Sequence, residues 1–134
     1  MANNLDDFLI IRTRFVDRWN LAYPQISFYF DNETPVEPTT SWVRLSIQPG
    51  FERRRSIARK TYEQLGRVYL QVFGPPDAVD MDLWPLAHVF ADAFRDWQSS
   101  DGRIRFDTPT FQFTGAQDDD PAMLLINIPY TAQH

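Results

Sequence analysis

The sequence predicts an α/β (α+β) domain in which a mostly antiparallel sheet of four to five strands is covered by two main helices. Residues 67–73 alternate polar and apolar side chains with period two, as a strand with one face on a core does. Residues 83–97 instead repeat their apolar side chains at helical spacing. Pro75 and Pro76 separate the two patterns, because proline cannot donate to a sheet ladder.

An amphipathic helix is predicted near the N-terminus, ending close to Asn20. Asn3 or Asn4 can cap it, and Asp6 and Asp7 suit the positive end of the helix dipole. Its expected apolar face consists of Leu5, Phe8, Ile11, Phe15, Val16 and Trp19.

Two strands follow this helix. Alternation over residues 26–30 predicts a short strand, and residues 31–40 hold two prolines and no period, which indicates a loop. Residues 42–48 alternate again, and Pro49 and Gly50 are expected to end that strand. Its inward side chains are expected to be Val43, Leu45 and Ile47.

Residues 51–60 form a polar insertion between two strands and are too long for a tight hairpin turn. The pattern leaves three structures open: a long hairpin arm, a short helix or a mobile loop. Connections of this length without structure of their own are often functional.

The central strand should bury Val68, Leu70 and Val72. In the helix after it, Asp80 or Asp82 is a candidate N-cap, and Pro85 is expected in the first turn, where its missing N–H matters little. The apolar stripe that should cover the sheet is Leu83, Leu86, Ala87, Phe90, Phe94 and Trp97.

The last part of the chain predicts two more strand regions. Residues 103–113 form a strand interrupted at Thr108 and Pro109, and residues 123–131 form the last strand. Pro129 suggests that the end of this strand lies at an edge or beyond regular pairing. Strands adjacent in sequence should pair antiparallel: 42–48 with 67–73, and 103–113 with 123–131.

The composition predicts one domain over residues 1–134. A hydrophobic content of 43% argues against global disorder, and the absence of cysteine excludes disulfide and thiolate chemistry. No signal peptide and no membrane-spanning run is expected. The net charge of −5 argues against general nucleic-acid binding.

The charge is unevenly spread along the chain. Residues 1–48 carry four Arg against six acids, residues 49–67 carry six Lys and Arg against two Glu, and residues 68–134 carry three Arg against ten Asp. Opposite patches on one surface suit head-to-tail contact between copies. The alternative is that the basic segment is a solvated loop.

Residues that usually carry chemistry are scarce. His88 has Asp92 at i+4, but no third metal ligand follows from the spacing, so a surface contact is favoured. Residues 118–120 lack the spacing of a calcium loop. There is no Gly-rich phosphate loop and no nucleophile elbow. The sequence therefore predicts no catalytic, cofactor-binding or metal-binding residue, and an enzyme is the weaker hypothesis.

Three aromatic side chains have two possible roles, base stacking or packing. Tyr69, Phe111 and Phe113 could stack on bases as in sheet-based RNA readers, but the basic signature of such readers is absent. Packing in the core or at a subunit interface is the favoured interpretation.

The order of these pieces resembles a known family. A helix is followed by residues 41–49 (SWVRLSIQP), a polar insertion, residues 66–75 (GRVYLQVFGP), a second helix and residues 126–132 (INIPYTA). This arrangement resembles the phage tail terminator-like family of long-tailed bacteriophages and prophages. The resemblance covers nearly the whole chain and depends on spacing and strand patterns, with no catalytic signature.

The resemblance implies a non-enzymatic ring subunit, typically of a homohexamer, that caps the tail tube, ends its polymerisation and offers a docking surface to the head or neck. Its implied partners are copies of itself, the tail tube protein and a head-completion or neck protein, with DNA only as passing cargo in the pore and no membrane. The implied location is the virion, after assembly in the bacterial cytoplasm. The alternatives are another head-tail joining or neck protein of this fold, or a monomeric ligand-binding domain or enzyme.

The basic insertion departs from the family pattern and is the candidate subunit or tail-tube interface. Its dense like charges repel each other, so it is expected to be poorly ordered in a lone subunit and to become ordered on assembly. The candidate interface residues are Phe51, Arg53, Arg54, Arg55, Ile57, Arg59 and Lys60.

Overall fold

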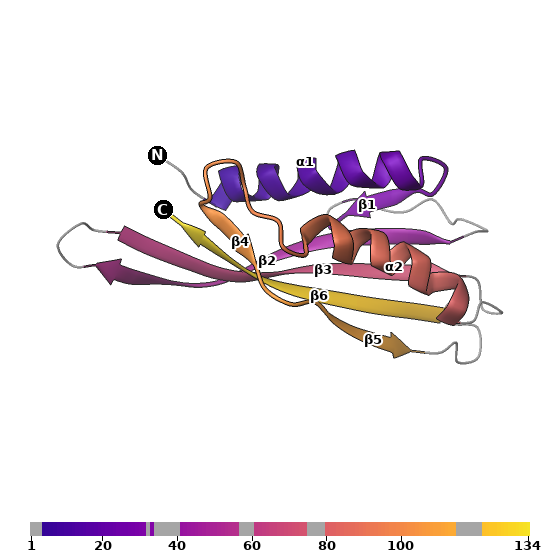
Figure 1. The fold of residues 1–134 in the computed structure, drawn as a ribbon. Helices are drawn as coiled ribbons and strands as arrows, with labels where there is room; N and C mark the ends of the chain where they lie inside the picture. The colour runs from indigo at the N-terminus through magenta and orange to yellow at the C-terminus, as the bar shows by residue number, and fades with distance from the viewer. Residues whose placement is uncertain (1–3, 32, 34–40, 57–60, 75–79, 115–121) are drawn as a thin grey trace.

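The computed structural model describes residues 4–31, 33, 41–56, 61–74, 80–114 and 122–134. These residues form two helices and six strands (Figure 1). The helices are α1 (Asn4–Ala22) and α2 (Asp80–Phe94). The strands are β1 (Phe28–Phe30), β2 (Trp42–Ser56), β3 (Thr61–Gly74), β4 (Ile104–Phe106), β5 (Thr110–Thr114) and β6 (Ala122–Gln133).

The six strands make one sheet in the order β1-β2-β3-β6-β4, with β5 also paired to β6. Only the pairing of β1 with β2 is parallel within the described residues. The predicted class is therefore confirmed, with six strands where four to five were expected. Both predicted antiparallel pairings are also confirmed: β2 with β3, and the interrupted β4 and β5 with β6.

A single hydrophobic core lies between the sheet and both helices (Figure 1). The predicted inward positions of the three long strands are buried, except Ile47, which is only partly buried. They share one face because alternate residues of paired strands point to the same side. The fully buried strand side chains include Val43, Val68, Leu70, Val72, Leu124, Ile126 and Ile128, and the helices add Ile11, Phe15, Trp19, Leu83 and Phe90. The opposite face of the sheet carries half-buried side chains such as Trp42 and Tyr69.

Two details of the helices differ from the expectation. Leu5 is expected on the apolar face of α1 but is 64% exposed, because Asp7, not Leu5, lies on the buried side of the first turn together with Ile11 in the next turn. In the second helix, α2 already begins at Asp80, so Pro85 lies in the second turn instead of the first. Proline there cannot donate to the carbonyl four residues before it.

Pro49 and Gly50 do not end β2, contrary to the prediction. The register runs from Pro49 opposite Gly66 to Glu52 opposite Gln64, so two residues of β2 face one residue of β3. This is a β-bulge, which bends the strand without ending it. A Cβ on Gly50 would lie 2.8 Å from the Leu65 carbonyl oxygen, so glycine is required for this close approach.

Pro129 does not mark an edge or the end of pairing either. β6 continues to Gln133 and pairs with β3 along its whole length. On the other side of β6, Pro129 lies between the residues paired to β4 and those paired to β5, so its missing N–H removes no ladder bond. The Asp107 N–H donates to the Pro129 carbonyl at this break, at 2.9 Å.

Leu70→Ala tests the assignment of the sheet faces. Leu70 is fully buried between β3 and the helices, so truncation should lower the free energy of unfolding by about 2–5 kcal/mol through lost burial and a residual cavity. Chemical denaturation measures this change. The matched control is Leu21→Ala at a leucine that is 78% exposed, where the change should stay within about 0.5 kcal/mol. Equal effects at both positions would contradict the assigned faces.

Candidate functional site

The basic insertion is the far half of a long β-hairpin. We call residues 50–56 of β2 and 61–64 of β3 the hairpin arm. The arm projects beyond the N-terminal end of α1 (Figure 1). Of the three structures left open by the sequence, the structure has the hairpin arm for residues 51–56. The expectation that this stretch is poorly ordered in a lone subunit is wrong for residues 51–56, because cross-strand pairing with residues 61–64 already orders them.

Residues 51–54 of the arm present one exposed aromatic ring, one carboxylate and two guanidinium groups. Phe51 is 62% exposed. Arg53 donates through Nη2 and Nε to Glu63 Oε1, at 2.6 and 2.9 Å. Arg54 Nη2 donates to the Tyr62 hydroxyl at 3.0 Å. Arg55 lies on β2, and the remaining predicted interface residues, Ile57, Arg59 and Lys60, lie outside the described residues.

The Arg53–Glu63 pair is asymmetric. The Glu63 side chain is only 4% exposed, whereas that of Arg53 is 55% exposed. The carboxylate is therefore withdrawn into the arm and the guanidinium remains available to a partner. Such a pair holds the arm together and leaves its surface basic.

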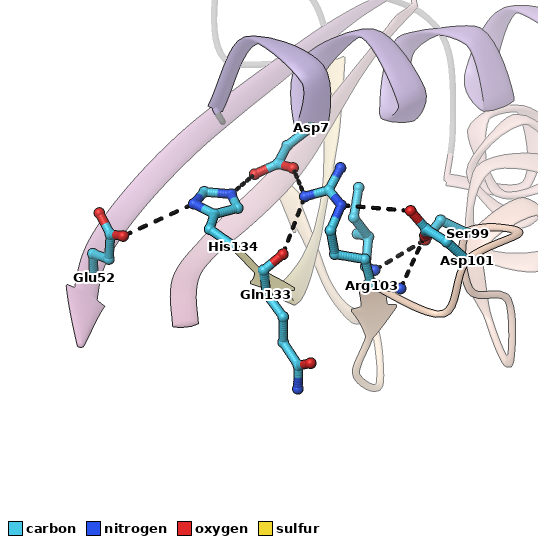
Figure 2. A network of polar contacts seen from close by, with 8 residues as sticks. Asp7, Glu52, Ser99, Asp101, Arg103, Gln133 and His134 are labelled. Atoms are coloured by element: carbon cyan, nitrogen blue, oxygen red, sulfur yellow. Dashed lines mark hydrogen bonds and ion pairs between the residues drawn. The ribbon is translucent and has the colours of Figure 1, made fainter. Parts of the chain in front are cut away.

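A buried polar network lies at the root of the arm (Figure 2). Asp7 in the first turn of α1 is fully buried, and Arg103 Nη1 donates to its Oδ1 at 2.5 Å. His134 Nε2 lies 2.8 Å from the second oxygen, Oδ2. Both oxygens of this carboxylate are thus occupied, which a buried charge requires.

The network extends to the turn before β4. The Ser99 hydroxyl donates to Asp101 Oδ1 at 2.6 Å and accepts from the Ile104 N–H. The Arg103 N–H also donates to Asp101 Oδ1, at 3.0 Å. The Ser99 hydroxyl, and then the Arg103 N–H, lower the pKa of the Asp101 carboxyl below its usual value. Asp101 is therefore ionised at neutral pH.

The network also touches the arm itself. His134 Nδ1 lies 3.9 Å from Glu52 Oε1, and the His134 backbone exchanges hydrogen bonds with Tyr62 at 2.9 and 3.2 Å. The three central side chains Asp7, Arg103 and His134 are at most 14% exposed and bind each other. Their geometry therefore fits anchoring of α1 to β6 better than proton transfer to a substrate.

The sequence predicts for Asp7 only a place at the positive end of the helix dipole. Its partners lie 96 and 127 residues further along the chain, so no local pattern connects them. The single usable signal was a second carboxylate in the first turn of an amphipathic helix, on the side that faces the core.

The metal-ligand candidates from the sequence, His88 and Asp92, have different partners in the structure. Asp92 pairs with Arg95 at 3.2 Å, and the exposed His88 ring lies 5.6 Å from Trp84 and 5.8 Å from Phe111. No group of three or more metal-ligating side chains occurs within the described part of the chain. Residues 118–120 lie outside it.

The aromatic candidates also have different environments. Phe111 packs at 5.1 Å from Trp84 against the core, Phe113 is 40% exposed, and Tyr69 is half-buried on the open face of the sheet. On that face Trp42 and Phe73 stack on each other at 4.3 Å and 18°. The three candidate rings therefore do not form one base-stacking surface in the structure.

None of the helices described here is long and apolar enough to cross a membrane. No protein-family model matches the chain, and no curated protein matches it. Among solved structures, one chain whose name describes no function superimposes with a TM-score of 0.71 at 18% sequence identity. The match covers 100% of this chain and 97% of that chain. This similarity shows that the whole fold occurs in another protein, and it assigns no activity.

Asp7→Asn tests the anchoring role of the buried network. Removing the charge leaves the nearly buried Arg103 guanidinium with only the exposed Asp101 carboxylate, 3.6 Å from its Nε, as a counterion. The free energy of unfolding should therefore fall by about 3 kcal/mol. Urea denaturation at neutral pH measures it. Asp92→Asn is the matched control, because the Asp92–Arg95 pair is exposed and should contribute less than about 1 kcal/mol. If Asp7→Asn costs no more than this control, the network is not an anchor.

Tyr130→Phe tests a second buried group. The Tyr130 hydroxyl has no hydrogen-bond partner among the described residues, and burial, followed by the charge of Asp7, raises its pKa to about 12. Since the unfolded chain loses this proton near pH 10.0, the stability from the protonated hydroxyl is full below that pH and is lost as the pH rises toward 12.

The phenylalanine variant should therefore be at least as stable as the parent at neutral pH, and its stability should fall less steeply above pH 10.0. Unfolding free energies measured as a function of pH give both values. A large loss of stability at neutral pH would mean that the hydroxyl has a partner.

Proposed function

We propose that this protein is a structural ring subunit that caps a phage tail tube, ends its polymerisation and forms the docking surface for the head or neck. The observation that carries the proposal is the hairpin arm. It extends past the core and presents an exposed phenylalanine and basic side chains, which adds little to the stability of a lone domain. Such a projection is suited to contact with another chain.

The three segments that carry the family resemblance also support the proposal. Residues 41–49 overlap the start of β2, residues 66–75 overlap β3, and residues 126–132 belong to β6. These strands are direct neighbours in the sheet. The resemblance therefore concerns one contiguous structural unit, although it remains a similarity of pattern.

The rival class, a monomeric ligand-binding domain or enzyme, has less support. The fully buried Asp7 carboxylate is occupied by Arg103 and His134, and the nearly buried Glu63 carboxylate by Arg53. The proposed partners are further copies of the chain in a homohexamer, the tail tube protein and a neck protein. DNA would only pass through the pore, and the proposed location is the junction of tail and neck in the virion.

The proposal predicts that the arm arginines contribute to assembly more than to folding. Arg54→Ser with Arg55→Ser should leave the melting temperature nearly unchanged, since Arg54 is exposed and its hydrogen bond to the Tyr62 hydroxyl lies at the surface. Arg53 is kept because it pairs with the buried Glu63. Ring formation and tube capping should weaken, and more so at low salt, because salt screens exposed charges.

Sedimentation velocity and electron microscopy, with and without tail tube protein, measure ring size and capping. Arg18→Ser with Arg105→Ser is the matched control, because it removes the same charge from exposed positions outside the arm. A strict monomer that also ignores tube protein would contradict the proposed function. Equal behaviour of both double variants would contradict the role of the arm.

A further inference from the structure

Among the exposed large apolar side chains, two lie on different parts of the surface, one on the arm and one on α1. Phe51 on the arm is 62% exposed, and Leu9 on the outer side of α1 is 54% exposed. Large apolar side chains that remain exposed beside charged groups mark protein contact surfaces. The size and charge of the groove beside Leu9 can be compared with those of Phe51 and its neighbours.

Leu9 borders a groove between α1 and residues 97–101. The groove has a volume of about 440 Å³, with Leu9, Ile10 and Trp97 as its main apolar lining. Its size suits an aromatic side chain. The Arg14 guanidinium lies 4.8 Å from the Trp97 ring centre, and its Nε donates to the Ala93 carbonyl, so this cation is already held in place.

The rim of the groove is acidic. Its lining holds two exposed carboxylates, Asp17 and Asp101, and one guanidinium, that of Arg14. Beside the lining, Arg103 Nε lies 3.6 Å from Asp101 Oδ2, so Asp17 is the carboxylate farther from this cation. Phe51 lies on a segment of opposite charge, because residues 49–67 carry six Lys and Arg against two Glu. Glu52 follows Phe51 directly, and the exposed Arg53 and Arg54 come next. An aromatic side chain flanked by cations is thus matched by an apolar groove flanked by anions.

The arm cannot reach the groove of its own chain. β3 is held by β6 as far as Glu63, and Phe51 lies at the bulge opposite Leu65. The arm therefore points along the sheet and away from the outer side of α1 (Figure 1). An arm that enters this groove must therefore belong to another copy of the chain.

We propose that the groove formed by Leu9, Ile10 and Trp97 receives Phe51 from the arm of a second copy of this chain. The arm arginines of that copy then lie over Asp17 and Asp101. Because arm and groove are different surfaces, the contact is head-to-tail, and it closes into a ring when the rotation allows. The inference rests on the proposed ring function and identifies the subunit contact within it.

Cross-linking tests the contact directly, because the chain has no cysteine of its own. Glu52→Cys protein, which keeps Phe51, is mixed with Thr13→Cys protein, which keeps Leu9, and the mixture is treated with a short bis-maleimide. The control mixture pairs Glu52→Cys with Leu21→Cys, at an exposed leucine of the same helix. Proximity raises the effective concentration, so the first mixture should yield cross-linked dimer at least roughly tenfold faster. Equal yields, or no dimer in either mixture, would overturn the contact.

Charge reversal gives an independent measurement. Asp17→Arg and Arg54→Asp should each weaken self-association in sedimentation experiments, and the two together should restore much of it. Asp92→Arg is the matched control on α2, where reversal should not rescue Arg54→Asp. Rescue by both reversals, or by neither, would count against the specific contact.

A mixture of Phe51→Ala and Leu9→Glu proteins tests the direction of the contact. The first variant keeps a groove and the second keeps an arm, so they should form heterodimers that cannot grow, while each alone should associate roughly 30-fold more weakly than the parent. Rings that form unchanged from either variant would overturn the inference.

These results separate the contact from the proposed function. Specific cross-links without capping of tail tubes would leave the contact valid and remove the function. Capping by rings without specific cross-links would leave the function valid and remove the contact.

Discussion

The rest of the structure depends on the unbroken ladder between β3 and β6. The ladder runs from Glu63 opposite Gln133 to Gly74 opposite Ala122 without a register shift. Because the register is fixed, the aliphatic side chains of both strands meet on one face, which the two helices cover. A slip by one residue would turn this whole set toward the open face. β2 adds to one side of the pair, and β4 and β5 add to the other.

The same ladder sets the direction of the hairpin arm. At its root, Tyr62 exchanges backbone hydrogen bonds with His134, and His134 binds the Asp7 carboxylate in α1. The arm is therefore tied to the helical layer as well as to the sheet. A projection that is held in position before it meets a partner loses less conformational entropy on binding.

The sequence was informative where the physics is local. Period-two alternation identified Val68, Leu70 and Val72 as core, and the helical period identified most of the covering stripe. It failed where a residue acts through a distant neighbour. Pro49 and Gly50 look like a strand end, but the Leu65 carbonyl opposite them makes a bulge. The Asp7 network and the groove beside Trp97 join segments far apart in the sequence, so neither was predictable from periodicity.

The open edge of β2 gives the basic arm a further consequence. Within the described residues, β2 pairs with β1 only from Val43 to Leu45, so from Ser46 onward one side of the strand has no neighbouring strand. A long unpaired edge is a template for adding strands from other chains, and amyloid-like aggregation begins in this way. Pro49, the bulge after it and the run of arginines are the features that natural proteins use to block such pairing. The arm's positive charge thus also protects the protein from uncontrolled sheet extension.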